Sequence, residues 1–380
     1  MKLEACFILS PHNWYDHVSK NKVNRPLKLS EQIANNNYFD YLIVINRLKP
    51  SRVIQIKNDN RTLLKRGMLY NLLFDRKERI YYLEHCLPFG FFEKEFLTRI
   101  IFKVKKFLGF DNYVMSIFDP KSTYIFSKVE GVKHFDAYDD WSLSPLFNEK
   151  KRHMKYINSG YGLANKNADL ITANTEQMIN KFKDCRNIIM VNNTTSLRGD
   201  AEFEKKQNDK KIVGYIGNIH ERIDLEIVKF IAESCKDYNF VFIGKDEYKN
   251  GEFQRLVAEL DNILYLGSIP YNQVPQHIYN FDVCIIPHVV NKYTLSQDSM
   301  KMYDYLAMGK PIVTTPIPPA TSVSKYIYIA NDKYNFVEKL KIATLENNEM
   351  IVQKRKEYIR NNSWFFKAKT IISNIEGVGL

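Results

Sequence analysis

The hydrophobic positions of this 380-residue chain form two series of short apolar runs that alternate with amphipathic stretches. Helical periodicity lies between several runs of the first half, as at residues 29–36 and 160–167. This alternation predicts an α/β domain with a mostly parallel, doubly wound sheet. The runs themselves predict strands at residues 5–9, 41–45, 53–56, 113–118, 124–126, 132–135, 169–173 and 188–191.

The second half repeats the pattern after a polar segment, residues 199–211, that has no apolar period and is typical of a linker. The runs IVGYIG, FVFIG, ILYLG, VCIIP and IVTT predict strands, with helices expected at 224–235, 252–260, 273–280 and 299–308. Ligands bind at the carboxyl ends of strands in such sheets, so two tandem domains predict a ligand-binding cleft between them. We therefore predict Rossmann-like domains at 1–198 and 212–360, a linker at 199–211, and a closing helix within 361–380.

Composition narrows the environment of the protein and its classes of partner. The net charge of +12 favours anionic partners, although the basic residues are not interleaved as in nucleic-acid-binding motifs. Five cysteines without CxxC spacing indicate a reducing compartment, with no disulfide framework and no zinc site. No apolar run approaches the ~20 residues that span a bilayer, and the N-terminal run is too short for a signal peptide. We expect a cytoplasmic protein that is able to lie on a membrane.

The segment DSMKMYDYLAMGKPIVTT, residues 298–315, contains the strongest chemical signal. Asp298 or Ser299 is expected to cap a helix that ends at Gly309. Lys301 falls in its first turn, where free N–H groups and the helix dipole favour a phosphate. Asp304 lies on the same face, where its carboxylate can accept hydrogen bonds from ribose hydroxyls. The alternative is a solvated Lys–Asp pair at i,i+3 spacing.

This segment resembles the donor-site helix of GT-B glycosyltransferases, in which a Lys precedes an acidic residue and a YLAxGKPIV run. The pieces GYIGNIHERIDLE, FVFIGK and NILYLGSIPYNQVPQHIYNFDVCIIP resemble the same C-terminal domain, and NSWFFKA resembles the tail helix that crosses back to the N-terminal domain. In the first half, NRPLKLSEQIA, NRLKPSR and FDAYDDWS are similar to pieces of the same branch. The nearest kin are bacterial polysaccharide and teichuronic-acid type transferases, including the xanthan glucuronosyltransferase group.

The resemblance implies two Rossmann-like domains facing across a cleft, and transfer of a sugar from a nucleotide diphosphate donor, UDP-linked, to a lipid-linked or polysaccharide acceptor. It implies no cofactor and no metal. The large retaining family has two Glu residues seven apart, whereas this chain has Ser296 and Asp304, which favours an inverting branch. The implied donor contacts are Gly217, Asn218 and Arg222 at the diphosphate, Lys301 on phosphate, Asp304 on ribose and Ile269 near the base. For Arg222, the alternative is a surface pair with Glu226.

An inverting transferase needs a general base, and the candidates are Asp140 and Asp139 in AYDDWS. The alternative is that these carboxylates cap the following turn. Trp14 and Arg25 are the expected acceptor contacts. Two other functions remain open: a nucleotide-sugar epimerase or hydrolase of the same fold, and a non-catalytic binding subunit.

A basic amphipathic helix is predicted at residues 93–109. Its aromatic and basic composition suits the interface of an anionic membrane, while the alternative is an ordinary helix that packs on its sheet. The expected membrane contacts are Phe96, Ile100, Lys103, Lys106 and Phe107.

Overall fold

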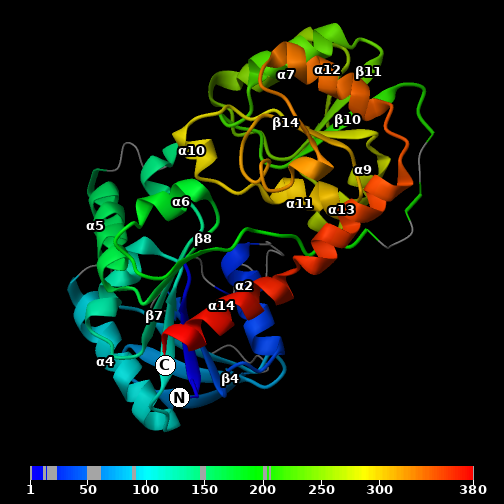
Figure 1. Cartoon of the computed structure of the whole chain (residues 1–380). Coiled ribbons are helices and arrows are strands. Elements are labelled where there is room, and N and C mark those ends of the chain that lie inside the picture. The colour runs from blue at the N-terminus through cyan, green and yellow to red at the C-terminus, as the bar shows by residue number, and fades with distance from the viewer. Residues whose placement is uncertain are drawn as a thin grey trace. The chain divides into compact units, whose positions relative to one another are not determined.

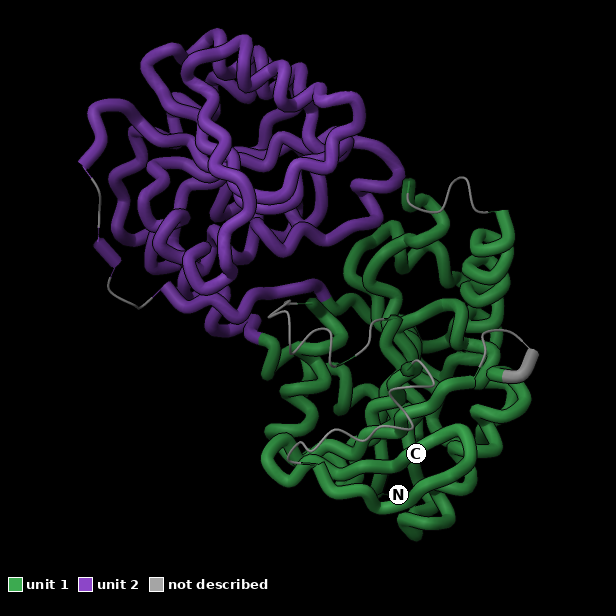
Figure 2. The backbone as a smooth tube through the Cα atoms, turned by 180° about the vertical axis from the view of Figure 1, so that it is seen from behind, with its two compact units in different colours: residues 1–191, 364–380 green, residues 192–363 purple. Residues whose placement is uncertain are grey.

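The computed structural model describes residues 2–11, 14, 24–48, 61–87, 91–145, 151–199, 203–204 and 207–379. The chain forms two compact units, shown in Figures 1 and 2: unit 1 comprises Met1–Val191 and Trp364–Leu380, and unit 2 comprises Asn192–Ser363. The sequence placed the corresponding boundaries at 198 and 360. The strand predicted at 53–56 lies outside the described residues. Within the described part of the chain, no helix is long and apolar enough to cross a membrane.

Unit 1 is built on a nine-stranded sheet in the order β3-β4-β5-β2-β1-β6-β7-β8-β9. The strands from β5 to β9 in this order pair in parallel, whereas β3 and β4 add an antiparallel edge. The sequence analysis missed β3, β4 and β5, whose apolar residues are interrupted by charges. The strands are β1 (Ala5–Leu9), β2 (Tyr41–Arg47), β3 (Arg61–Arg66), β4 (Tyr70–Asp75), β5 (Ile80–His85), β6 (Tyr113–Ile117), β7 (Val132–Ala137), β8 (Leu170–Ala173) and β9 (Ile188–Met190).

The strand predicted at 124–126 is wrong, because these residues lie in the 3₁₀ helix η1 (Pro120–Ser127). Asp119 begins this helix by accepting a hydrogen bond from the backbone N–H of Lys121 at 3.0 Å. The Asp-Pro pair is a helix-start signal that the apolar run after it concealed.

Helices cover both faces of the unit 1 sheet (Figure 1). One face carries η1, α4 (Phe91–Leu108), α5 (Lys151–Asn167) and α6 (Glu176–Lys181), and the other carries α2 (Arg25–Asn35) and α14 (Trp364–Val378). In α4, Leu97, Ile100 and Val104 pack into the core against the sheet. Ile100 is only 7% exposed, so the prediction that it contacts a membrane is wrong.

Unit 2 contains a six-stranded parallel sheet in the order β12-β11-β10-β13-β14-β15, the Rossmann arrangement. The strands are β10 (Lys211–Ile216), β11 (Tyr238–Ile243), β12 (Ile263–Tyr265), β13 (Val283–Ile286), β14 (Ile312–Thr314) and β15 (Tyr328–Ile329). On one face lie α7 (Leu225–Ser234), α8 (Glu252–Glu259) and α12 (Lys333–Thr344). On the other lie α9 (Val274–Asn280), α11 (Met300–Ala307) and α13 (Glu349–Asn361), as Figure 1 shows. The strand order reverses between β10 and β13, which is where such sheets bind ligands.

A buried polar network connects α2 to the middle of the unit 1 sheet. The Arg25 guanidinium donates to both oxygens of Asp136 in β7, at 2.7 and 2.9 Å. Asp136 also accepts from the Thr172 hydroxyl at 2.6 Å, and His134 lies 3.0 Å from that hydroxyl. Burial lowers the pKa of His134 to about 4, so its ring is neutral. Arg25 is 2% exposed and belongs to this internal network, which contradicts its expected contact with an acceptor.

Replacing Arg25 with Met should lower the free energy of unfolding by about 3–5 kcal/mol, because Asp136 would keep a buried charge without its partner. Urea denaturation measures this change. Lys2→Met is the matched control, since the Lys2–Asp40 pair is exposed and should contribute about 1 kcal/mol or less. Equal effects of the two substitutions would contradict a stabilising role for the buried pair. The double variant Arg25→Met/Asp136→Leu should recover part of the loss.

Candidate functional site

Two glycine turns at the carboxyl ends of β10 and β11 create a close approach between backbone and side chain in unit 2. Gly217 has φ 139°, and a Cβ at this position would lie 2.3 Å from Cε of Lys301 and 2.8 Å from its Nζ. Gly244 has φ 146°, and its Cβ would lie 2.0 Å from the carbonyl oxygen of Gly217. Only glycine allows this packing, which holds the Lys301 ammonium group beside the turn after β10.

Lys301 occupies the first turn of α11, as predicted, and one of the two expected residues, Ser299, stands at the cap position. Ser299 is the N-cap and makes no side-chain capping hydrogen bond. The Asp298 carboxylate instead accepts hydrogen bonds from the Tyr303 hydroxyl, at 2.9 Å, and from the backbone N–H of Asn193. The start of α11 therefore combines the positive end of a helix with the Lys301 charge.

Arg222 brings a second positive charge to the same end of the sheet. Its Nε donates to His220 at 2.9 Å and its Nη1 to the Gln297 side-chain oxygen at 2.6 Å, so the expected alternative, a surface pair with Glu226, is not what the structure shows. Burial, followed by the nearby Arg222, lowers the pKa of Lys301 to about 7. Two cations held this close repel each other, and an anion between or beside them would relieve the repulsion.

Two histidines, His220 and His288, lie near these cations, and both rings are neutral. Burial, with Arg222 and Lys301 as further causes, lowers the pKa of His220 to about 4. Burial and the same two cations hold the pKa of His288, which follows β13, well below its usual range. His288 also lies 3.4 Å from the hydroxyl of Tyr215, whose ring centroid is 5.2 Å from the Lys301 nitrogen. This diphosphate cluster, defined as Lys301, Arg222, His220, His288 and Tyr215, suits a phosphate-bearing ligand.

Asp304 lies one turn further along α11 in a different setting. Its Oδ1 accepts a hydrogen bond from the Thr195 hydroxyl, and burial raises the pKa of its carboxyl to about 7. Burial is the main cause of the pKa shifts of both Lys301 and Asp304, so the alternative of a solvated i,i+3 pair is not what the structure shows. The helix therefore carries a cation, which can attract a phosphate, and a separate carboxylate, which can accept hydrogen bonds from hydroxyl groups.

The remaining predicted donor residues lie at the ends of neighbouring strands. Asn218 is exposed, and its side-chain amide donates to Glu247 at 3.3 Å. Ile269 is half-buried and packs against the apolar cluster beneath α11. The sequence analysis missed Tyr215, His288, Gln297, Thr195 and Tyr271, and only His288 had a signal, at the end of the VCIIP strand.

The two candidate bases of unit 1 differ in their surroundings. Asp140 is 4% exposed, caps the 3₁₀ helix η2 (Trp141–Leu143) and accepts from the Lys181 ammonium group at 2.7 Å on both oxygens. The capping alternative therefore applies to Asp140. Asp139 is half-buried, its carbonyl oxygen accepts from Tyr161 at 2.9 Å, and as a base it stays a prediction. Trp14 is 4% exposed and packs edge-on against Tyr82, so its expected acceptor contact is contradicted by burial.

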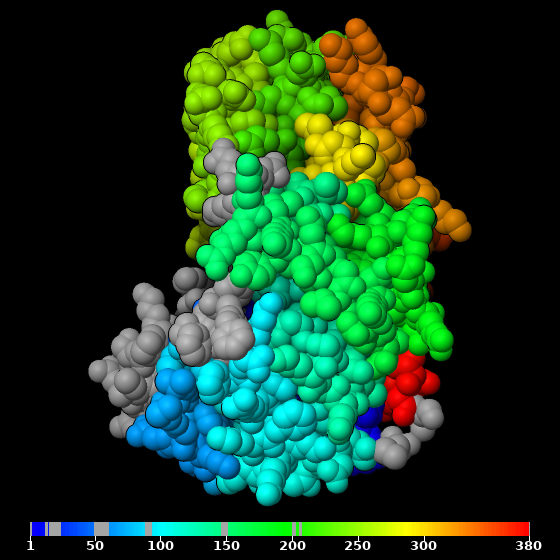
Figure 3. Space-filling view, turned by 90° about the vertical axis from the view of Figure 1, so that its left-hand side faces the viewer, coloured from blue at the N-terminus to red at the C-terminus, as the bar shows by residue number. Residues whose placement is uncertain are grey.

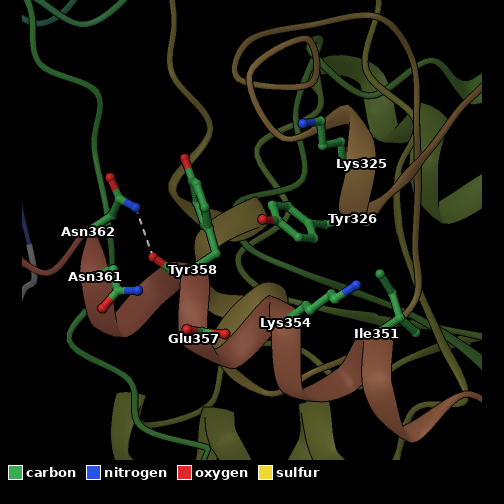
Figure 4. A pocket seen from close by; sticks show the side chains of 8 residues that line it. All are labelled: Lys325, Tyr326, Ile351, Lys354, Glu357, Tyr358, Asn361 and Asn362. Atoms are coloured by element: carbon green, nitrogen blue, oxygen red, sulfur yellow. Dashed lines mark hydrogen bonds between the residues drawn. The ribbon is translucent and has the colours of Figure 1, made fainter.

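A separate cavity of about 470 Å³ lies in unit 2, between α13 and the 3₁₀ helix η6 (Ser324–Tyr326) (Figure 4). Tyr326 and Tyr358, whose ring centroids are 5.3 Å apart, line it together with Lys325 and Lys354. No residue of the diphosphate cluster lines it, so it is a distinct feature of the surface.

Comparison with known proteins finds a family match in the C-terminal region. Residues 210–343 match the family described as Glycosyl transferases group 1. The putative teichuronic acid biosynthesis glycosyltransferase TuaH of Bacillus subtilis (strain 168) is 28% identical over 160 residues. That alignment spans 40% of this chain and 40% of the relative. The diphosphate cluster and Asp304 all fall within the matched family region.

Solved structures similar to the whole chain confirm its fold. An α,α-trehalose 6-phosphate synthase from Burkholderia multivorans matches with a TM-score of 0.66 and 10% identity, covering 100% of this chain and 97% of its own. Anabaena Alr3699/HepE in complex with UDP and glucose matches with a TM-score of 0.62 and 12% identity, covering 98% and 99%. The predicted GT-B fold and the resemblance to bacterial polysaccharide and teichuronic-acid type glycosyltransferases are confirmed.

Replacing Lys301 with Ala should weaken binding of a nucleoside diphosphate by about ten- to a hundredfold, because each charge-assisted hydrogen bond contributes roughly 1.5–3 kcal/mol. The same change should leave the affinity for the free nucleoside almost unaltered. Asp304→Ala should weaken the binding of both the nucleoside diphosphate and the free nucleoside. Calorimetry with both ligands measures the contrast.

Lys333→Ala is the matched control for Lys301. Lys333 also begins a helix and also lies over an aromatic ring, 5.0 Å from the Phe230 centroid, but it stands beside no glycine turn. Its replacement should not change either affinity. If Lys301→Ala bound the diphosphate as tightly as the parent protein, the phosphate site would have to lie elsewhere, with Arg222 as the next candidate.

Proposed function

We propose that this chain is a glycosyltransferase that moves a sugar from a UDP-linked donor to a lipid-linked or polysaccharide acceptor in bacterial cell-surface glycan synthesis. The observation that carries the proposal is the diphosphate cluster, which lies beside a glycine turn at the strand-order reversal of a GT-B fold. Two similar proteins support the details: Alr3699/HepE, whose complex contains UDP and glucose, and TuaH, whose description names teichuronic acid biosynthesis.

In this proposal unit 2 binds the donor. Lys301 and Arg222 would offset the charge that develops on the diphosphate as the bond to the sugar breaks, which is how fixed charges lower an activation barrier. Asp304 would accept a hydrogen bond from the ribose, and Ile269 would lie near the base. Because protein cations meet the diphosphate charge, we propose that the reaction requires no metal.

Unit 1 would hold the acceptor and supply the base. Asp139 is the better candidate because it is half-buried, whereas Asp140 is buried, caps η2 and pairs with Lys181. An inverting reaction is supported by Ser296, which is buried and donates to the Tyr293 carbonyl oxygen at 2.7 Å. This position therefore offers no carboxylate to a sugar, unlike the retaining family.

Asp139→Asn should lower turnover by ~10²-fold or more and leave donor affinity nearly unchanged, because the acceptor hydroxyl would lose its general base. The assay incubates the protein with a panel of nucleotide sugars, with and without acceptor glycans, and measures the released nucleotide and the product. Asp140→Asn is the control: it should lower stability through the lost Lys181 pair more than it lowers turnover of the folded protein.

The same assay separates the proposed function from its alternatives. Nucleotide release that does not depend on an acceptor would indicate a hydrolase, and a changed donor sugar would indicate an epimerase. Donor binding without any turnover would indicate a non-catalytic subunit. If Asp139→Asn and Asp140→Asn both kept near-normal turnover, the base would lie elsewhere.

The exposed face of α4 supports a peripheral position on an anionic membrane. Among the described side chains of α4, this face consists of three cations and three phenylalanines that are 39–45% exposed: Arg99, Lys103, Lys106, Phe96, Phe102 and Phe107. The ammonium group of Lys65 in β3 lies 4.6 Å from the Phe107 ring centroid, so β3 adjoins α4, as Figure 3 shows in blue and cyan. Exposed Leu63 and Leu64 extend the apolar area onto that strand.

Changing Arg99, Lys103 and Lys106 together to Glu should abolish binding to liposomes that contain anionic lipid. The reason is that each basic residue near such a surface contributes about 1 kcal/mol. Cosedimentation measures binding, which should also weaken at high salt in the parent protein.

The triple change Lys151→Glu, Lys155→Glu and Lys166→Glu on α5 is the matched control, since it alters net charge equally on another exposed helix of unit 1. Binding that survives the α4 changes, or is lost equally with both triples, would rule out a specific membrane-facing role for α4.

A further inference from the structure

The first residues of unit 2 form hydrogen bonds with α11 and with Asp298, which precedes it. Asn193 donates its side-chain amide to the Asp298 carbonyl oxygen at 2.9 Å and its backbone N–H to the Asp298 carboxylate. Two residues later, the Thr195 hydroxyl donates to Oδ1 of Asp304. The segment that contains Asn193 and Thr195 thus runs beside α11, although it is distant in sequence. Through Thr195 it contacts Asp304 directly.

The Thr195 hydroxyl acts as a hydrogen-bond donor to Asp304. A hydroxyl has a single proton, and here that proton is directed to Asp304. The oxygen accepts from the backbone N–H of Leu197 at 2.9 Å. Thr195 is 4% exposed, so its orientation is fixed by these partners and by packing.

This arrangement assigns different roles to the two oxygens of Asp304. Oδ1 is held by Thr195, whereas Oδ2 has no hydrogen bond within the described part of the chain. The charged and titratable groups that face this carboxylate are Lys301 on α11, Tyr305 on the same helix, and Tyr271 in the 3₁₀ helix η5 (Tyr271–Gln273). Burial favours the neutral carboxyl, while Thr195 and Lys301 favour the ionised form that can accept hydrogen bonds.

We propose that Thr195 is a positioning residue of the donor site. Its hydroxyl holds the Asp304 carboxylate by one oxygen and leaves the other to accept a hydrogen bond from a ribose hydroxyl, which makes the site selective for ribonucleotides over deoxyribonucleotides. This inference rests on the proposed function, because it needs a nucleotide at this site.

Thr195→Val tests the proposal, since valine keeps the shape and removes the hydrogen bond. Calorimetry would measure affinities for uridine, 2′-deoxyuridine and 3′-deoxyuridine, and for their diphosphates, with the other three bases as a panel. The parent protein should favour the ribose form over at least one deoxy form by about ten- to a hundredfold, the value of a hydrogen bond to a charged group. Thr195→Val should lose most of that preference, and Thr195→Ser should restore it.

The pH dependence of uridine affinity gives a second readout, because the nucleoside has no phosphate through which Lys301 would act. Affinity should fall as the pH drops through the pKa of Asp304, about 7, since only the ionised carboxylate accepts the hydrogen bond. Without the Thr195 donor this pKa rises, so the fall should begin at a higher pH. Thr194→Val is the matched control, because the buried hydroxyl of Thr194 makes no hydrogen bond in the described structure.

The outcomes distinguish a failure of this inference from a failure of the proposed donor function on which it rests. Loss of the ribose preference in Thr195→Val but not in Thr194→Val supports the positioning role. A Thr195→Val protein with the parent's preference and pH midpoint overturns it, as does an equal loss of affinity for every ligand including inorganic pyrophosphate. If the parent protein bound no nucleoside diphosphate at all, the proposed donor function itself would be overturned.

Discussion

Repulsion between the cations at the strand-order reversal of unit 2 is the interaction on which the candidate site depends. Lys301 lies beside the glycine turn after β10, and burial, followed by the nearby Arg222, lowers its pKa to about 7. Burial by itself would favour apolar side chains here, so a fold that keeps charges at this place gains when an anion arrives. His220 and His288 add no further positive charge, since both stay neutral beside the two cations.

The backbone near Lys301 also accommodates its buried positive charge. Without Cβ atoms, Gly217 leaves room for the Lys301 side chain and Gly244 for the Gly217 carbonyl group. Asp298 is occupied by Asn193 and Tyr303 and does not cap α11, so no carboxylate neutralises the helix start. The one carboxylate on the helix face, Asp304, is held by Thr195. The contacts of Asp298 therefore leave the positive end of α11 without a capping carboxylate.

In unit 1, α4 has two faces of different composition. Its inward side chains, including Leu97, Ile101 and Val104, pack into the core against the sheet. Its outward side chains mix exposed phenylalanines with cations, and both Arg99 and Lys65 lie over phenylalanine rings. A membrane-facing helix and a helix packed on its sheet were alternatives at the level of sequence. The structure shows the packing face, and the exposed cations and phenylalanines form the separate face for which we propose membrane contact.

The sequence by itself determined what depends on short-range pattern: most strands, the GT-B fold, and the place of Lys301 and Asp304 on one helix, because apolar period and helix-end chemistry are local. Tertiary structure decided what depends on distant partners. Arg25 and Trp14 were expected at a binding surface and are buried, since Asp136 and Tyr82 lie far away in sequence. Asp140 and Asp139 are indistinguishable neighbours in sequence, and the fold separates them by burying Asp140 against Lys181 while Asp139 stays half-buried. Thr195 carried no signal in its polar segment, because its role exists only where the chain returns to Asp304, 109 residues later.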